Sequence, residues 1–218
     1  MSDSLSDTVM TPAVHAACDD LSASVIALST ALQERDCYTQ HHCSRVEHLA
    51  WHFGRYLDMD EMDLSDLLLA ARFHDVGKIG IPDMVLLKPG RLDEAERAIM
   101  RTHSERGQRV FLATGRPDAR RVGLLIRQHH EAWDGSGYPD GLAGKAIEPG
   151  ARMLAIVDGY DAMTTTRPYR VAMEHERAMA ILREESGSRL DPALVAAFEA
   201  MMLTQPELML AGCESVCA

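Results

Sequence analysis

Long apolar runs, an N-terminal signal sequence and an even set of cysteines are all missing from this 218-residue chain. No apolar run reaches the ~20 residues that a membrane-spanning helix needs, which argues against such a helix. The N-terminus has neither a basic start nor an apolar core, so we expect a cytoplasmic protein. The five cysteines are scattered, which favours reduced thiols over a disulfide framework.

An excess of positive charge is also missing, because the formal net charge is −11. Proteins that follow the backbone of DNA or RNA are normally basic, so bulk nucleic acid is not expected as a partner. A membrane is not expected as a partner either, because no apolar run is long enough to span one. An acidic protein can still bind a small anion. It then needs clustered Lys and Arg side chains, or bound metal ions, to supply local positive charge.

Alternating strand patterns are nearly absent, whereas apolar residues recur with the period of a helix in most of the chain. The helical segments are 21–36, 39–57, 64–73, 94–112, 120–133, 151–165, 174–186 and 191–202. Asp191 is a suitable N-cap for the last of them, with Pro192 at the first helical position. We predict an all-α fold, a compact single-domain bundle over residues 18–203, with a flexible tail over 1–17 and another over 204–218.

Several histidines fall on the apolar faces of these segments. At about 100° per residue, His42 lies in line with Val46, Leu49 and Phe53 on the face that should point inward. A second stripe of the same helix is predicted to face solvent and contains His41, Arg45, His48 and His52. A lone inward histidine is most simply a hydrogen-bonded core residue, so His42 by itself indicates little.

Four other segments repeat this arrangement, which favours a shared cation. A buried polar group without a partner costs roughly 2 kcal/mol or more, and one cation would satisfy several such groups together. Neutral imidazoles and carboxylates are ligands for divalent Fe, Mn and Zn. The candidate ligands exceed the four of one tetrahedral site and suit two metal ions bridged by Asp75: His42, His74, Asp75, His103, His129, His130 and Asp158.

Five motifs resemble the HD-GYP family, HD-domain phosphohydrolases that act as cyclic-di-GMP phosphodiesterases. They are "ERDCYTQHHCSRV", "HDVGKIGIPD", "THSERG", "QHHEAWDGSGYPDGL" and "ARMLAIVDGYDAMTTTRPYR". They follow the family's order from about residue 21 to 202, and the set is far more specific than a lone His-Asp pair. The resemblance implies hydrolysis of cyclic-di-GMP to linear pGpG, GMP or both.

The resemblance also implies roles for individual residues. The seven candidate ligands match its metal-binding positions, and Lys78 would contact the scissile phosphate and stabilise added charge. Asp75 would bridge the metals and could also handle a proton. Gly77 is expected to adopt a left-handed conformation at the end of its helix. The alternative is that Lys78 is simply an exposed loop lysine.

Substrate contacts are implied at two further places. Arg167 and Arg170 match substrate-binding positions, although an arginine pair at a helix end could instead bind backbone carbonyls. The loop formed by Gly137, Tyr138 and Pro139 is implied to shape the site, and binding of signalling proteins through it is left open. Taken alone, this loop could be no more than a rigid Gly-rich turn.

Tyr38 stands where some family members have a Glu that helps to hold a third metal ion. A phenol, with a pKa of about 10, is a poor metal ligand at neutral pH, so we expect two divalent ions and no third one. The resemblance favours Fe or Mn, with Zn or Ni possible. Three alternatives stay open: an inactive fold that binds nucleotides or proteins, a di-iron oxygenase, and an enzyme that prefers 3′,3′-cyclic GMP-AMP.

Overall fold

The computed structural model describes residues 26–27, 30, 37–166 and 171–209. Within these ranges the chain forms helices, turns and loops, with two isolated β-bridges and no β-strand. The helices are α3 (Cys37–Tyr56), α4 (Glu61–Phe73), η1 (Val76–Gly80), α5 (Asp83–Leu86), α6 (Glu94–Arg101), α7 (His103–Leu112), α8 (Ala119–Gln128), η2 (Gly144–Ala146), α9 (Pro149–Thr164), α10 (His175–Glu185), α11 (Pro192–Thr204) and η3 (Pro206–Met209). The all-α prediction is confirmed.

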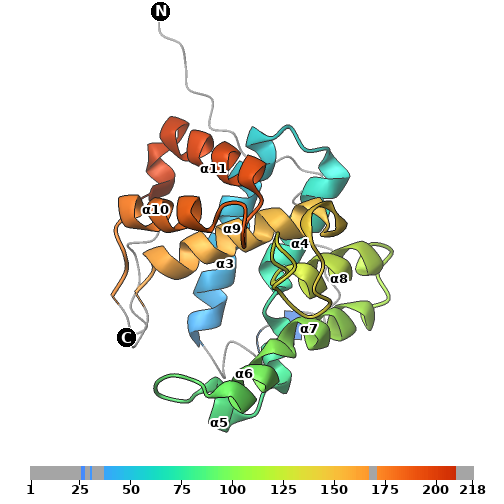
Figure 1. Ribbon diagram of the computed structural model, residues 1–218. Helices are drawn as coiled ribbons and strands as arrows, with labels where there is room; N and C mark the ends of the chain where they lie inside the picture. The colour runs from blue at the N-terminus through green and yellow to red at the C-terminus, as the bar shows by residue number, and fades with distance from the viewer. Residues whose placement is uncertain (1–25, 28–29, 31–36, 167–170, 210–218) are drawn as a thin grey trace, which may run out of the picture.

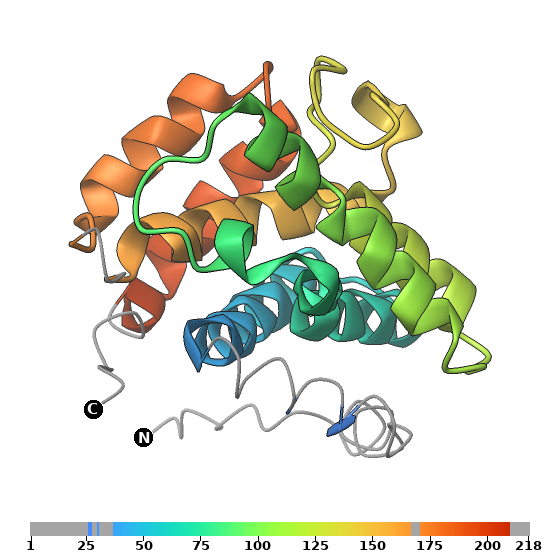
Figure 2. The ribbon, with the colours of Figure 1, turned by 90° about the horizontal axis from the view of Figure 1, so that it is seen from below.

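Helix α9 runs through the middle of the bundle (Figure 1). Helices α3, α4 and α8 pack against it, and so do α10 and α11. Helix α7 packs against α8 and against the short helix η1. Seen from below, α3 and α4 lie side by side (Figure 2). Segments that are far apart in the sequence therefore meet around α9.

Helix α4 is the most deeply buried part of this arrangement. Residues 67–71 have no exposed surface, which is typical of a helix that is apolar on all sides. The side chain of Asp60 caps its N-terminus by accepting hydrogen bonds from the backbone N–H groups of Met62 and Asp63. The helix ends at Phe73, so His74 and Asp75 emerge inside the protein, where both are buried.

The predicted start of the last helix is confirmed. The side chain of Asp191 accepts hydrogen bonds from the backbone N–H groups of Ala193 and Leu194, and Pro192 is the first residue of α11. Asp191 also forms an ion pair with Arg152 of α9, at 2.5 Å. One carboxylate thus both caps α11 and joins it to the central helix.

Two predicted helices differ from the observed ones. The segment 94–112 is two helices, because Thr102 bonds to the Ile99 carbonyl through its backbone N–H (3.1 Å) and its hydroxyl (2.7 Å), which tightens the last turn of α6. His103 is therefore the first residue of α7. In the segment 120–133, α8 ends at Gln128, and His129 and His130 lie in the turn that follows.

The prediction for Gly77 is wrong, because its φ is not positive. Gly77 lies in η1 against the backbone of α7. A Cβ at this position would lie 1.9 Å from the carbonyl oxygen of His103 and 2.4 Å from the nitrogen of Gly107. Glycine is therefore required here by the close approach of two backbones, not by a left-handed turn.

The ends of the predicted domain are described only in part. Residues 1–17 lie outside the described residues, as does most of the segment 18–36. Residues 204–209 belong to the predicted C-terminal tail, yet Leu208 in η3 is buried in the core, so packed structure extends at least to that point. No helix in the described part of the chain is sufficiently long and apolar to span a membrane.

Candidate metal centre

One cluster of potential ligands combines residues from α3, the end of α4 and α9. Its members are His42, His74 and Asp158, whose ligand atoms all lie within 4.8 Å of one another. The Nε2 atom of His42 is 3.0 Å from Oδ1 of Asp158, and Nε2 of His74 is 3.9 Å from the same oxygen. Three predicted ligands thus converge although the first and the last of them, His42 and Asp158, are more than 100 residues apart in the chain.

A second cluster consists of His103, His129 and His130. His103 begins α7, and the other two follow the end of α8. The Nε2 atoms of His103 and His129 are 3.3 Å apart. These three imidazoles could hold a second metal ion.

Asp75 lies between the two clusters. One of its oxygens, Oδ2, is 3.5 Å from Nε2 of His74, and the other, Oδ1, is 3.5 Å from Nε2 of His103. Oδ2 also accepts a hydrogen bond of 2.6 Å from the amino group of Lys78. A carboxylate that faces a different cluster with each oxygen has the arrangement expected of a bridging ligand. The structure therefore brings all seven predicted ligands together.

The histidine rings are oriented by hydrogen bonds outside the centre. The Nδ1 atoms of His74, His103 and His129 lie 2.7, 2.8 and 2.6 Å from the carbonyl oxygens three residues earlier in the chain. A carbonyl can only accept, so Nδ1 carries the proton and Nε2 presents its lone pair to the centre. Among the described residues, Nε2 of His74 is a buried polar atom with no hydrogen-bond partner. A cation at this place would satisfy it.

His42 is oriented differently, by a carboxylate. Its Nδ1 is 2.7 Å from Oδ2 of Asp161, one turn after Asp158 on α9. Arg45 donates two hydrogen bonds to the same carboxylate, at 2.6 and 3.0 Å. The predicted solvent-facing stripe is therefore wrong at Arg45, which is partly buried. His52 is also partly buried and bonds to Gln205, whereas His48 is exposed as predicted.

The charges of the centre suit cation binding. Burial lowers the pKa of His129 well below its usual value, and burial together with His103 lowers that of His130 to about 3. Burial alone would raise the pKa of Asp75, but Lys78 and the surrounding histidines hold it well below its usual range. Neutral imidazoles and ionised carboxylates are the forms that bind divalent metals.

His42 is the exception among the imidazoles. Burial alone would lower its pKa, but hydrogen bonds with Asp158 and Asp161 raise it to about 9. Its proton thus supplies positive charge beside the two carboxylates, in addition to the charge of Arg45 on Asp161. A metal ion beside His42 and Asp158 would take over this role, so the donor set fits divalent metals.

The loop after the second cluster is held in place by a buried carboxylate. Glu131 accepts hydrogen bonds from the backbone N–H groups of Asp140 (2.7 Å) and Leu142 (2.9 Å). A Cβ on Gly137 would lie 2.2 Å from the nitrogen of Ala132, so only glycine fits there. The loop consequently passes directly against the residues that follow His130.

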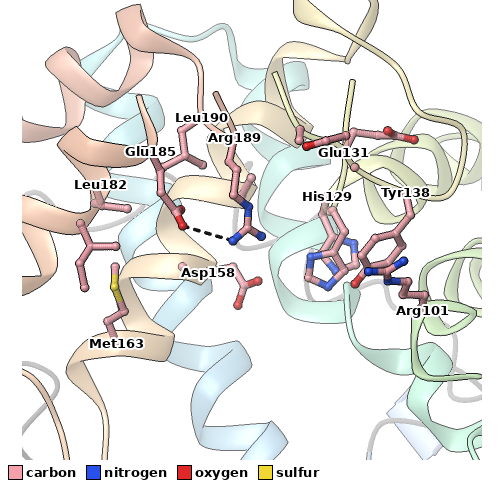
Figure 3. Close-up of a pocket in the computed structure, with 17 residues that line it drawn as sticks. Arg101, His129, Glu131, Tyr138, Asp158, Met163, Leu182, Glu185, Arg189 and Leu190 are labelled. Atoms are coloured by element: carbon pink, nitrogen blue, oxygen red, sulfur yellow. Dashed lines mark hydrogen bonds and ion pairs between the residues drawn. The ribbon is translucent and has the colours of Figure 1, made fainter. Parts of the chain in front are cut away.

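A cavity of about 550 Å³ adjoins the centre. His129, His130 and Asp158 line it, as do Gly137 and Tyr138 of the loop, whereas Pro139 is not among its lining residues. Figure 3 shows Tyr138 and Arg101 beside the histidines, with Leu182, Met163 and Glu185 on the opposite side. The Tyr138 ring is 4.9 Å from the His130 ring, and Arg101 lies 5.4 Å over the Tyr138 ring.

Four contributors to this region were not identified as site residues from the sequence. Arg101 and Arg189 line the cavity, and Arg45 and Asp161 orient His42. Asp161 could have been found, because it lies one turn after Asp158 on the inner face of α9. Arg101 is the last residue of α6 and Arg189 lies in a turn. Helical periodicity gives no information about side-chain direction at either place. The predicted substrate contacts Arg167 and Arg170 lie outside the described residues, as does the Tyr38 side chain.

Comparisons with known proteins agree with this arrangement. The cyclic di-GMP phosphodiesterase response regulator RpfG of Xanthomonas campestris pv. campestris is 39% identical over 77% of this chain and 44% of its own length. The 3′3′-cGAMP-specific phosphodiesterase 3 of Vibrio cholerae is 34% identical over 88% of this chain and 42% of its own length. This chain spans less than half of the curated relatives it matches first.

A solved structure shares the fold. The HDG"Y"P protein Bd1817 from Bdellovibrio bacteriovorus superposes with a TM-score of 0.64, at 20% identity, over 88% of this chain and 61% of that one. A family model described as "HD domain" matches residues 23–194, which include all seven predicted ligands. From the extent of that match, this chain belongs to the HD-domain family.

Proposed function

We propose that this protein is a metal-dependent phosphodiesterase that hydrolyses cyclic-di-GMP. The observation that carries the proposal is the pair of ligand clusters joined by Asp75, whose two oxygens face one cluster each at 3.5 Å. The cyclic di-GMP phosphodiesterase RpfG is 39% identical to this chain, whereas the 3′3′-cGAMP-specific phosphodiesterase 3 is 34% identical. This difference supports cyclic-di-GMP as the first substrate to test.

Two divalent cations would be held by the seven clustered residues. His42, His74 and Asp158 would hold one, His103, His129 and His130 the other, and Asp75 would bind both. Bound there, the cations would lower the pKa of water and neutralise charge on the phosphate oxygens. Imidazole and carboxylate ligands accept Fe, Mn, Zn and Ni alike, so the choice of Fe or Mn rests on the family resemblance.

Lys78 would supply a further positive charge beside the phosphate. Burial alone would lower the pKa of its amino group, but Asp75 raises it above the usual value. The group is therefore a cation at neutral pH and can neutralise charge that develops on a phosphate oxygen. A proton-transfer role for Asp75 stays a prediction.

The cavity supports a substrate of nucleotide size. Its volume of about 550 Å³ falls within the ~300–1,000 Å³ of typical ligand pockets. Gly137 and Tyr138 line it, which supports a site-shaping role for their loop, while binding of signalling proteins through that loop stays a prediction. Arg167 and Arg170 likewise stay predicted substrate contacts.

Hydrolysis by metal-loaded protein tests the proposal. Protein loaded with Mn²⁺ or Fe²⁺ should convert cyclic-di-GMP to pGpG or GMP, resolved by chromatography, and should contain about two metal ions per chain. His74→Ala and Asp75→Ala should lose both turnover and metal. His48→Ala, which removes an exposed histidine of α3, is the matched control and should keep both.

Three results would contradict the proposal. Normal turnover in both variants would show that hydrolysis does not require His74 or Asp75. Binding of cyclic-di-GMP without turnover at every metal loading would instead favour a nucleotide-binding module. Consumption of oxygen with a substrate that lacks phosphate would favour a di-iron oxygenase.

A further inference from the structure

The cavity wall opposite the histidines carries an ion pair that the hydrolytic chemistry does not use. Glu185 is the last residue of α10, and Arg189 lies in the turn that follows. Nη1 of Arg189 is 3.2 Å from Oε1 of Glu185, and both residues line the cavity. Figure 3 shows the guanidinium group directed into the cavity, between Glu185 and the histidines.

The turn that holds this pair is tied to the loop that follows the second ligand cluster. The backbone N–H groups of Trp133 and Asp134 donate to the carbonyl oxygens of Arg189 and Ser188, at 3.0 and 2.8 Å. Within the turn, the Arg189 N–H donates to the carbonyl oxygen of Glu185 at 3.0 Å. The backbone that carries Arg189 is thus fixed relative to the metal centre.

A stabilising role does not explain the placement of the pair. The side chains of Arg189 and Glu185 are 67% and 32% exposed, and an exposed pair four residues apart adds little to stability. A charge pair presented to a cavity is better suited to contact a ligand.

The two groups match the hydrogen-bonding edges of guanine. A carboxylate accepts from the N1–H and N2–H donors of guanine, and a guanidinium donates to its O6 and N7 acceptors. Adenine presents an unprotonated N1 next to its amino group, so a carboxylate there meets one acceptor with another. We propose that Glu185 and Arg189 form a guanine-recognition subsite in this cavity. The inference rests on the proposed function, since it assigns a base specificity to the same site.

Base selectivity tests the subsite. The values of kcat/KM should be measured for cyclic-di-GMP, cyclic-di-AMP and bis(p-nitrophenyl) phosphate, a diester without a base. In Glu185→Gln and Arg189→Gln, the cyclic-di-GMP value should fall about tenfold or more relative to the base-free diester. The preference for cyclic-di-GMP over cyclic-di-AMP should fall as well. Thermal unfolding of each variant verifies that it is folded.

A second Arg–Glu pair, which joins α10 to α11, supplies the control. Arg183 of α10 pairs with Glu199 at 2.7 Å, with 48% and 34% of the side chains exposed, and neither residue lines the cavity. Arg183→Gln and Glu199→Gln should keep both substrate ratios. If the ratios in the Glu185 and Arg189 variants also match those of the wild type, the subsite is refuted.

The failure of the subsite and the failure of the proposed function give different results. Wild-type protein that hydrolyses bis(p-nitrophenyl) phosphate but shows no preference for cyclic-di-GMP over cyclic-di-AMP refutes the subsite and leaves a phosphodiesterase. If the wild type hydrolyses none of the three diesters, the proposed function fails. Calorimetric binding of GMP then decides the subsite: weaker binding in both variants supports it, and binding equal to that of the wild type overturns it.

Discussion

Replacing Gly77 by alanine should disturb the candidate metal centre through the backbone alone. The added Cβ would lie 1.9 Å from the carbonyl oxygen of His103, about 1.5 Å closer than ordinary van der Waals contact begins. It would also lie 2.4 Å from the backbone nitrogen of Gly107. Both neighbours are backbone atoms of α7, so no side-chain rotation can relieve the contact, and α7 or η1 must move.

The expected magnitude follows from this displacement. Overpacking a well-packed interior costs about 1–3 kcal/mol, which lowers Tm by about 2–12 °C for a protein of this size. His103 moves with α7, and its Nε2 lies 3.3 Å from His129 and 3.5 Å from Asp75. Because ligands must be held to within ~0.5 Å of their productive positions, we also expect the protein to retain less metal.

Thermal unfolding and elemental metal analysis of Gly77→Ala test this reasoning. Gly123→Ala is the matched control, since the nearest atom to its added Cβ is a side-chain carbon of Gln108 at 3.4 Å. Alanine is favoured over glycine inside a helix by about 0.8–1.0 kcal/mol, so this variant should keep its metal and should not lose Tm. Unchanged Tm and metal content in Gly77→Ala would refute the backbone contact.

Three further predictions concern the ligands and the loop. Asp161→Asn removes the charged partner of His42 and should weaken metal binding about 10–100-fold in a competition titration with a chelator. A metal affinity equal to that of the wild type would contradict the orienting role of Asp161. Glu131→Gln leaves one backbone N–H of Asp140 or Leu142 without its acceptor, so hydrogen exchange of these two amides should accelerate and KM should rise. Unaltered exchange would speak against the anchor. Chelation of the metal should remove the roughly 2.7 kcal/mol that binding contributes at a free metal concentration of 100 times Kd, which lowers Tm by about 5–11 °C. Identical Tm values with and without chelator would argue against metal binding to the folded state.

Local patterns in the sequence predicted much of the fold and the clustering of the candidate metal ligands. A histidine or aspartate at the period of an apolar stripe must point where that stripe points, so the inward placement of His42 and Asp158 could be inferred from their own helices. The cap at Asp191 could be predicted for a similar reason, because capping depends on a few consecutive residues. Neither inference required knowledge of a neighbouring element.

The predictions that failed depended on contacts between distant segments. Arg45 was assigned to a solvent-facing stripe, but it bonds to Asp161, which lies 116 residues further along the chain. Gly77 was assigned a left-handed turn, whereas the carbonyl of His103 in another helix excludes a side chain there. A single helix does not reveal what packs against its polar flank.

By itself, the amino-acid order determined an all-α chain with seven candidate metal ligands predicted to point inward, because period and residue type are local properties. Only the tertiary structure decided how these side chains group: three on each side of Asp75, with one carboxylate oxygen toward each group. It also decided that Arg101 and Arg189 line the adjoining cavity. Such pairings depend on how helices pack across the bundle, and packing is set by the fit of many distant residues together.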